Sequence, residues 1–447
     1  MRQEYRNINL VQYAGKMNRL PRVLIITSEP FGGNTSSAFT LATLFKPWPK
    51  ECLAQIYTKA LVPDFEVCSR YWQLQTLKWR DQGHAVMPLY GGQSPEGAKG
   101  GSRRLGMLTP EVKRLVAFSR DILPSRIISP ELQAWLKEFK PDLVYSWLGS
   151  NKIIALVKEI SEYCSIPVVP HFMDDWMSSN LPFPLFRNIQ ALAFRRSLQK
   201  LLPHCCEGVG ISEAMAKEYA QRYSIPMDYA ANGVGQDILQ QLRSGAGAVS
   251  ADNVLRVTVL GRLEYGRLKL LENFVKACQA TTLPDIQVIL NICSTTPMPK
   301  GFPTAEYVKI LWQKAPSNDH LIDIQKHTDV VLYIDSFDTF TRRYFRLSFS
   351  GKIPICLAIG RPIITIGPAV LNSVRFLKSC ALGPVITSPR IDHMRNAIEQ
   401  IILWNQTKRK ETGLKAWEIA NSHHSSDQQS RRLQGVLLRC ACRESID

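Results

Sequence analysis

The sequence predicts an α/β protein made of two doubly wound domains, each with a parallel sheet covered by helices on both faces. Short apolar runs alternate with longer helical patterns along most of the chain, as they do in strand–helix–strand units. The alternation stops in a stretch rich in Gly, Ala and Ser at residues 235–252, and then restarts. A chain of 447 residues that is 45% hydrophobic is long enough for two such domains, and its composition excludes a disordered protein.

The first half of the chain contains five apolar runs with the composition of buried strands. RVLIIT at residues 22–27 and DLVYSW at 142–147 are the longest of them. Ser212 precedes a helical pattern and is its expected N-cap, because a serine hydroxyl accepts a hydrogen bond from the first turn. Residues 92–106 are basic and rich in Gly, which indicates a mobile surface loop. We predict strands at residues 22–27, 53–57, 142–147, 167–170 and 208–211, and helices at 37–45, 110–120, 130–139, 152–163, 183–202 and 213–223.

The second half repeats the alternation, beginning with VLRVTVL at residues 254–260. Pro354 has no N–H and fits only the first turn of a helix, so a helix begins near it. We expect an N-terminal domain at residues 1–240, a second domain at 241–410, and C-terminal helices at 411–447 that at least partly pack back on the first domain. The second half is predicted to contain strands at 254–260, 286–293, 329–334 and 362–366, and helices at 267–279, 354–359, 369–378, 392–404, 411–421 and 428–440.

The net charge of the chain limits the classes of partner that it is expected to bind. It carries 55 basic and 38 acidic residues, and the resulting net charge of +17 is spread over both halves. This excess suits nucleic acid, an anionic membrane surface or phosphorylated small molecules. The sequence has no zinc finger, basic zipper or aromatic-rich RNA motif, so we expect no nucleic-acid partner. No stretch approaches the roughly 18 consecutive apolar residues of a membrane span.

Eleven cysteines are scattered along the chain without a CxxC pair, and His204 beside two of them lacks the spacing of a zinc site. Residues 1–18 have no apolar core of a secretion signal. We therefore expect reduced, mostly buried thiols and a cytoplasmic protein that can attach to the inner face of a membrane.

The loop after the first predicted strand contains Gly32 and Gly33. Glycines let the backbone approach a ligand closely, and amide groups at the start of the next helix favour anions. The loop is not a GxGxxG motif, and Tyr57-Thr58-Lys59 stands where a dinucleotide site needs an acidic residue. An ordinary tight turn remains the alternative.

A second group, His171, Asp174, Asp175 and Trp176, follows the strand predicted at residues 167–170. Active-site residues gather at the carboxyl ends of strands in this fold class. A histidine flanked by carboxylates can act as a general base or donate a hydrogen bond to a substrate hydroxyl. The spacing does not define a metal site, and a structural role with Asp175 as a helix cap remains the alternative.

A third group consists of Arg262 and Arg267 in GRLEYGR, directly after the strand at residues 254–260. Two guanidinium groups at a strand–loop–helix junction can neutralise a diphosphate. The alternative is a pair of solvated loop arginines.

The fourth group places Ser348, Ser350, Gly351 and Lys352 just before the helix that begins near Pro354. Hydroxyl groups, a glycine backbone and an ammonium at the positive end of a helix form a candidate anion site. The segment lacks the GxxxxGK[ST] order, which argues against Mg-dependent phosphoryl transfer.

Taken together, these segments resemble a known family. GRLEYGR and SFSGKIPICLAIGRPIITIGP resemble the donor half of GT-B glycosyltransferases of family 4 (group 1). PHFMDDW, ISEAMAKEYAQRY and Asn232-Gly233-Val234 are similar to the acceptor half and crossover region of that family, and TSEPFGGNTSS also fits. The resemblance covers roughly residues 20–420. It implies two Rossmann-like domains facing across a cleft and a retaining transfer of sugar from a UDP- or GDP-sugar, with no cofactor or required metal.

The resemblance also implies roles for individual residues. Arg262, Arg267 and Lys352 would hold the donor diphosphate, and His171 would lie near the reacting sugar, which makes His171, Arg267 and Lys352 the catalytic candidates. The remaining donor-binding candidates are Gly32, Gly33, Ser348, Ser350, Gly351, Ile353 and Pro354, and the acceptor-binding candidates are Asp174, Asp175 and Trp176.

The sequence departs from the family pattern at two carboxylates of the donor loop. Leu347 and Ile355 stand at these positions, and Arg267-Leu268 replaces the usual Lys-Gly pair. The leading interpretation is a glycosyltransferase of polysaccharide or glycolipid synthesis with a glycan or lipid-linked acceptor. The missing carboxylates motivate a second, a catalytically inactive glycan- or nucleotide-binding protein. A nucleotide-sugar epimerase, which shares the architecture, is the third.

Overall fold

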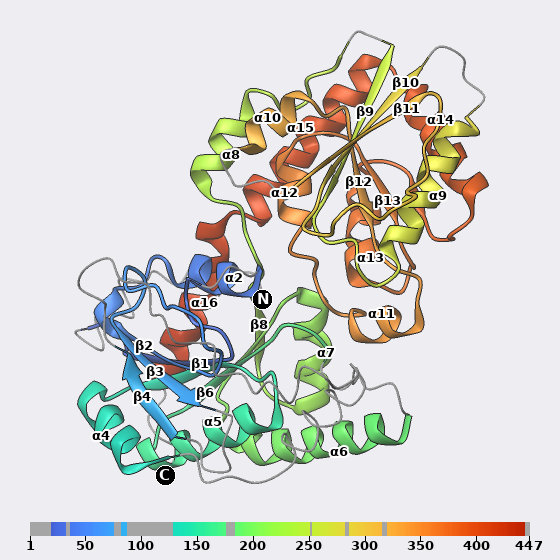
Figure 1. Ribbon diagram of the computed structural model, residues 1–447. Coiled ribbons are helices and arrows are strands. Elements are labelled where there is room, and N and C mark those ends of the chain that lie inside the picture. Colours follow the sequence, from blue (N-terminus) through green and yellow to red (C-terminus); the bar gives the residue numbers. More distant parts are fainter. Residues whose placement is uncertain are drawn as a thin grey trace. The chain divides into compact units, whose positions relative to one another are not determined.

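The computed structural model describes residues 19–32, 36–75, 82–86, 128–175, 184–250, 253–281, 286–314 and 320–442. The chain forms two compact units, each with one sheet and helices on both of its faces (Figure 1). Unit 1 consists of Met1–Ala230 and Ser430–Asp447, and unit 2 of Ala231–Gln429. The loop predicted at residues 92–106 and the helix predicted at 110–120 lie outside the described residues.

The sheet of unit 1 is parallel except at one edge. Its order is β4-β3-β2-β1-β5-β6-β7-β8, and only the β3–β4 pair runs antiparallel. The chain starts in the middle, moves outward, and then returns to pair β5 with the other side of β1. The strands are β1 (Val23–Thr27), β2 (Leu53–Tyr57), β3 (Arg70–Gln75), β4 (Gln82–Val86), β5 (Leu143–Trp147), β6 (Val168–Phe172), β7 (Gly208–Gly210) and β8 (Met227–Tyr229).

The core of unit 1 follows the two-residue period of its strands. Val23 and Ile25 of β1 point to one face, where they pack with apolar residues of α2 (Ser36–Phe45) and α16 (Ser426–Ala441). Ser212 caps α7 as predicted, since its hydroxyl accepts a hydrogen bond from Met215 N at 3.0 Å. The helices are α2 (Ser36–Phe45), α4 (Pro130–Phe139), α5 (Asn151–Cys164), α6 (Pro184–Leu201), α7 (Glu213–Tyr223) and α16 (Ser426–Ala441), with short 3-10 turns η2 (Lys50–Cys52) and η4 (Leu202–His204).

The C-terminal helix α16 is bound to unit 1 by charge and by a covalent bond. Arg439 donates to both carboxylate oxygens of Glu207 at 2.9 and 2.6 Å. Cys206 and Cys440 form a disulfide across 234 residues of sequence, and the other nine cysteines are free thiols. The prediction of reduced thiols is therefore wrong for this pair, because sequence spacing did not show that residues so far apart meet.

The sheet of unit 2 is parallel throughout. Its order, β11-β10-β9-β12-β13-β14, places the first strand in the middle, and the direction of travel reverses between β9 and β12. The strands are β9 (Val254–Leu260), β10 (Gln287–Cys293), β11 (Val308–Gln313), β12 (Val330–Ile334), β13 (Ile363–Ile366) and β14 (Val385–Ile386).

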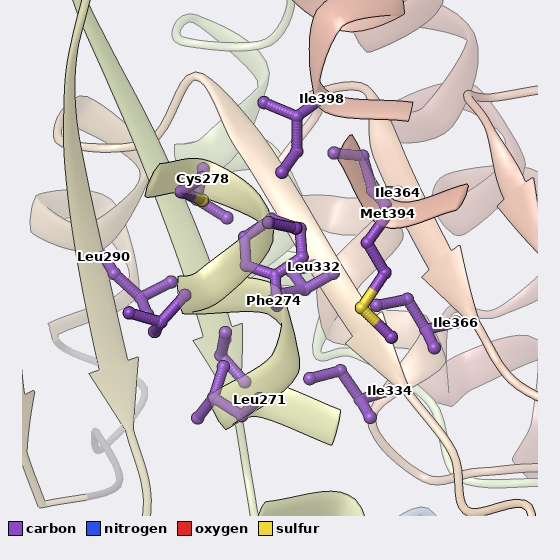
Figure 2. Packing of buried hydrophobic residues seen from close by; sticks show 14 of the residues in the cluster. Leu271, Phe274, Cys278, Leu290, Leu332, Ile334, Ile364, Ile366, Met394 and Ile398 are labelled. Atoms are coloured by element: carbon purple, nitrogen blue, oxygen red, sulfur yellow. The ribbon is translucent and has the colours of Figure 1, made fainter. Parts of the chain in front are cut away.

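Helices α9 and α14 pack together on one face of this sheet. Figure 2 shows Phe274 of α9 among Leu290 and Leu332 of the strands and Met394 of α14, all of them buried. The helices of unit 2 are α8 (Gln236–Arg243), α9 (Arg267–Gln279), α10 (Leu321–Lys326), α11 (Thr339–Tyr344), α12 (Ile353–Ala358), α13 (Asn372–Cys380), α14 (Ile391–Ile402) and α15 (Gln406–His423).

The units divide earlier than the sequence suggested. The boundary lies after Ala230 instead of residue 240, and of the C-terminal residues only those from Ser430 on belong to unit 1. The expected linker at residues 235–252 contains α8, whose Ile238, Leu239 and Leu242 are buried. This short helix was not predicted because the sequence that follows it is rich in Gly and Ala, which is typical of a linker.

The central strands were predicted within one or two residues, whereas the edges of the sheets were missed. β4 is largely polar, and β11 is an edge strand whose residues alternate between a covered and an exposed face of the sheet. β3, β8 and β14 were also not predicted; β8 and β14 are only three and two residues long. Among the described residues, no helix has the length and apolar character needed to cross a bilayer.

Candidate anion-binding site of unit 2

Two loops of unit 2 meet where the direction of the sheet reverses. One follows β9 and leads into α9, and the other follows the neighbouring strand β12. A Cβ on Gly266, which has a φ of +79°, would lie 3.2 Å from the Ser336 hydroxyl, so the loops touch. Ligands of doubly wound sheets bind outside the carboxyl ends of the strands at such a point.

Arg267 is held at this point by a carboxylate from the other loop. Its Nε and Nη2 donate to Asp335 Oδ1 at 3.1 and 2.6 Å, and the Tyr333 hydroxyl donates to Oδ2 at 2.6 Å. Burial alone would lower the pKa of Arg267, but the Asp335 carboxylate outweighs it and raises that pKa above its ordinary value. Burial and the same carboxylate raise the pKa of Tyr333 well above its ordinary value, so its hydroxyl stays a donor.

Lys352 reaches the same loop from the start of α12. Its Nζ donates to the Arg262 carbonyl oxygen at 2.9 Å. A Cβ on Gly261 would lie 2.6 Å from Lys352 Cε, so the glycine, at a φ of +85°, lets the lysine pass. Burial and the nearby charge of Arg267 lower the pKa of Lys352 to about 8. The structure therefore brings Lys352 and Arg267 together, as the sequence predicted, and Arg262 is exposed beside them.

The segment before α12 is held mainly through its backbone. The Ser350 amide donates to the Ser373 hydroxyl at 3.0 Å, and the Gly351 carbonyl accepts from Asn232 Nδ2 at 3.3 Å. Ser350 and Gly351 reach the surface, whereas Ser348, Ile353 and Pro354 are buried. Leu347, at one of the missing carboxylate positions, is also buried, and Ile355 is partly exposed. The donor-binding roles of the residues in this segment therefore stay predictions.

Asp335 and Tyr333 were not among the site residues predicted from the sequence. The sequence did contain a signal for Asp335. It is the first residue after a predicted strand, and site residues of doubly wound sheets lie at the carboxyl ends of the strands. Its pairing with Arg267, 68 residues away, depends on the sheet order. An aromatic cluster beside the cations was also not predicted from the sequence. It is formed by Tyr265, Phe340, Tyr344 and Phe345.

The candidate catalytic His171 lies in unit 1 and is fully buried. The Tyr145 hydroxyl lies 2.6 Å from His171 Nδ1, within hydrogen-bond distance, and accepts from Trp147 Nε1 at 2.7 Å. Burial lowers the pKa of His171 to about 3, which keeps the ring neutral. The ring is buried in this structure, and its contact with the sugar stays a prediction.

Asp175 is also buried, and it accepts hydrogen bonds from the Tyr219 hydroxyl at 2.9 Å and from Arg222 Nη1 at 3.1 Å. These bonds attach it to α7. Asp174 is partly exposed, and Gly32 lies in a turn with a φ of +85°. Gly33 and Trp176 lie outside the described residues.

Among the described residues, no three His, Cys, Asp or Glu side chains gather as ligands for a metal ion. The site brings together three cations, Arg262, Arg267 and Lys352, with the carboxylate of Asp335, and the loop between the arginines also contains the exposed Glu264.

Solved structures with the same fold exist. A glycosyltransferase from Rickettsia africae matches 95% of this chain and 100% of its own, at 10% identity and a TM-score of 0.57. A UDP-forming trehalose-phosphate synthase from Burkholderia xenovorans in complex with glucose-6-phosphate matches 93% and 99%, at 8% identity and a TM-score of 0.57. A trehalose-6-phosphate protein from E. coli bound with UDP-2-fluoro glucose matches 93% and 99%, at 9% identity and a TM-score of 0.56.

These likenesses show that the chain has the GT-B fold of glycosyltransferases, with two doubly wound α/β units. No protein-family profile and no curated protein matches the sequence. The fold class expected from the sequence is therefore confirmed, while the activity rests on the chemistry of the site.

Proposed function

We propose that the protein is a glycosyltransferase that moves a sugar from a UDP- or GDP-sugar to an acceptor. The observation that carries this proposal is the convergence of Arg262, Arg267 and Lys352 at the reversal point of the unit 2 sheet. Asp335 neutralises one of the three cations. The remaining positive charge balances a diphosphate in which each phosphate carries one negative charge.

The cations suit the bond that breaks in this reaction. When the glycosidic bond to the nucleotide breaks, negative charge develops on the departing diphosphate. Cations fixed beforehand in a partly buried site stabilise that charge in the transition state, and removing one such group raises the barrier by about 3–4 kcal/mol. We propose a metal-independent transfer, because the two arginines and the lysine can provide the positive charge that a divalent ion supplies elsewhere. That the transfer retains the configuration of the sugar is proposed from the resemblance of the sequence to family 4 glycosyltransferases.

The acceptor is proposed to be a glycan or a lipid-linked sugar bound by unit 1. The structural neighbours include a protein in complex with glucose-6-phosphate, which is an acceptor-sized sugar phosphate. Asp174 is the acceptor candidate that is both described and partly exposed. The net charge of +17 supports synthesis of a polysaccharide at an anionic membrane surface, and sedimentation with anionic vesicles at low and high salt tests this.

We propose a cytoplasmic location, which the nine free thiols support. The Cys206–Cys440 disulfide is the exception. Titration of thiols in the native protein under non-reducing conditions tests this proposal, and disulfides in addition to Cys206–Cys440 would contradict it.

The central experiment measures binding and turnover separately. Thermal shift with UDP, GDP and their sugars should identify a stabilising nucleotide, and incubation of that nucleotide-sugar with an acceptor panel should show transfer. EDTA should leave the rate unchanged. Lys352→Ala and Arg267→Ala should abolish transfer, whereas Lys269→Ala, an exposed cation of α9 paired with Glu272, should not.

Two results would favour the alternatives. Binding of nucleotide without turnover across the panel would indicate an inactive binding protein, for which the apolar Leu347 and Ile355 are the motivating observation. Conversion of the sugar without an acceptor would indicate an epimerase. Full activity of both Lys352→Ala and Arg267→Ala would reject the proposed site.

A further inference from the structure

An exposed tyrosine stands beside the cations of unit 2. Tyr265 is 45% exposed although it belongs to a cluster of aromatic rings. Its ring lies 6.0 Å from the ring centres of both Phe340 and Phe345, and these two lie 6.2 Å from each other. Phe340 also stacks on Tyr344 at 5.0 Å. The ring of Tyr265 is thus supported by its neighbours while a large part of its surface remains open to solvent.

The backbone conformation of Tyr265 is unusual for a tyrosine. Its φ of +56° lies in the left-handed region, which disfavours side chains other than Asn and Asp. Glycine or asparagine would form the same turn at lower cost. The turn therefore does not require a tyrosine, which points to a role for the ring itself.

The exposed ring is continuous with the proposed diphosphate site. Arg267 Cζ lies 6.0 Å from the centre of the Tyr265 ring, and Arg262 belongs to the same loop. A ligand whose phosphates contact these cations would carry its next group towards the ring. Among the parts of a nucleotide, the base is the one with flat π faces that stack on an aromatic side chain, whichever base it is.

We propose that Tyr265 is a nucleotide-binding residue that stacks on the base of the donor, with Phe340 and Phe345 holding its ring in place. This inference rests on the proposed function, because it takes the cations as the diphosphate site. It adds a binding contact for the nucleoside, which the charges alone do not provide.

The test compares nucleoside diphosphates with inorganic pyrophosphate by calorimetry of the full chain. Tyr265→Ala should weaken binding of UDP or GDP about tenfold, as loss of one aromatic–base stack does. Pyrophosphate binding should not change, because it has no base. Tyr265→Phe keeps the ring and should bind both ligands like the unchanged protein.

Two further variants separate stacking from folding and from general effects. Tyr265→Asn removes the ring but suits the left-handed backbone, so it should lose nucleotide affinity without a lower melting temperature. Tyr307→Ala is the matched control, since Tyr307 is a 61% exposed tyrosine of the same unit that precedes β11. It should leave both affinities unchanged.

The outcomes that overturn the inference differ from those that overturn the proposed function. Unchanged UDP and GDP affinity in Tyr265→Ala overturns the inference, and so does an equal loss for pyrophosphate, which would mean that Tyr265 only supports Arg267. A loss for the nucleotide-sugar but not for the nucleoside diphosphate would assign the ring to the sugar and also overturn it. If the unchanged protein binds neither pyrophosphate nor nucleotide, the proposed function fails, and the inference falls with it.

Discussion

The cations of the site differ in how their charge is maintained. Arg267 faces the carboxylate of Asp335 and stays charged at any pH at which the protein is folded. Lys352 Nζ donates to a neutral carbonyl, and burial together with the charge of Arg267 lowers its pKa to about 8. Lys352 is therefore the cation of the site whose charge changes in the mildly alkaline range.

Binding of the donor should weaken as the pH rises through about 8. Only the protonated ammonium of Lys352 attracts a phosphate, and the neutral amine prevails above its pKa. Calorimetry with a nucleotide-sugar between roughly pH 7 and 9.5 measures this, because its diphosphate does not titrate there, unlike a terminal phosphate with a pKa of about 6. Lys352→Arg should remove the dependence. A flat profile for the unchanged protein would contradict the prediction.

The same shift has the opposite consequence for the protein without ligand. Because the pKa of Lys352 is lower in the folded state than its ordinary 10.5, the unfolded state binds more protons between the two values. The contribution of Lys352 to the free energy of unfolding therefore rises with pH between about 8 and 10.5, and it is lowest below pH 8.

Replacing Asp335 should destabilise unit 2. Asp335→Asn leaves the Arg267 guanidinium, whose side chain is only 13% exposed, without its counter-charge, at a cost of about 3–5 kcal/mol in the free energy of unfolding. Urea denaturation measures the change, and adding Arg267→Met should recover part of the loss. Asp392→Asn, which breaks an exposed pair with Arg390, is the control and should change the free energy of unfolding much less, because solvent screens that pair. Equal effects of the two substitutions would contradict the prediction.

Among the secondary-structure elements of unit 2, one buried arginine connects the short helices around α12. Arg361 is buried and donates to four backbone carbonyls, those of Gly245, Gln325, Thr328 and Gly360, at 2.5–3.1 Å. Gln325 of α10 in turn donates to the carbonyls of Leu242 and Ile359. These bonds fix the segment after α8, which the sequence suggested was a linker, to the body of unit 2.

Arg361→Lys should therefore loosen this junction. An ammonium cannot reproduce the planar set of donors, so at least one buried carbonyl loses its partner, which costs about 1–3 kcal/mol per group. Chemical denaturation and hydrogen exchange of residues 242–250 should both show the change. Arg375→Lys, at an exposed position of α13, should have no effect. Normal protection of residues 242–250 in Arg361→Lys would contradict the role assigned to Arg361.

The two units differ in how the chain builds them. Unit 2 is one continuous segment, whereas unit 1 combines the first part of the chain with its C-terminal end. The Cys206–Cys440 disulfide and the Arg439–Glu207 pair join these two parts. Stability of unit 1 thus depends on contacts between residues that are distant in sequence.

Reduction of this disulfide should affect the units unequally. The bond constrains α16 against unit 1, so its loss should lower the stability of unit 1 by about 2–4 kcal/mol. Scanning calorimetry with and without reductant should show one transition move and the other, from unit 2, stay in place. Cys206→Ser should reproduce the shift without reductant, and Cys380→Ser, at a buried free thiol of unit 2, should not move the transition of unit 1. Equal movement of both transitions would contradict this assignment.

The sequence by itself determined the fold class, the central strands and the meeting of Arg267 with Lys352. The physical reason is local: buried parallel strands are continuous apolar runs, and their carboxyl ends lie along one edge of a sheet. Arg267 follows such a strand, whereas Lys352 was placed beside it by the helix start near Pro354 and by the resemblance to GT-B glycosyltransferases.

Only the tertiary structure decided which polar groups are enclosed and with whom they pair. His171 and Asp175 follow or end a strand as an active-site residue does, yet Tyr145 and Arg222 from other elements enclose them. The pairing of Asp335 with Arg267 depends on β9 and β12 being neighbours. Burial and pairing of this kind arise from contacts between distant residues, about which a local pattern carries no information.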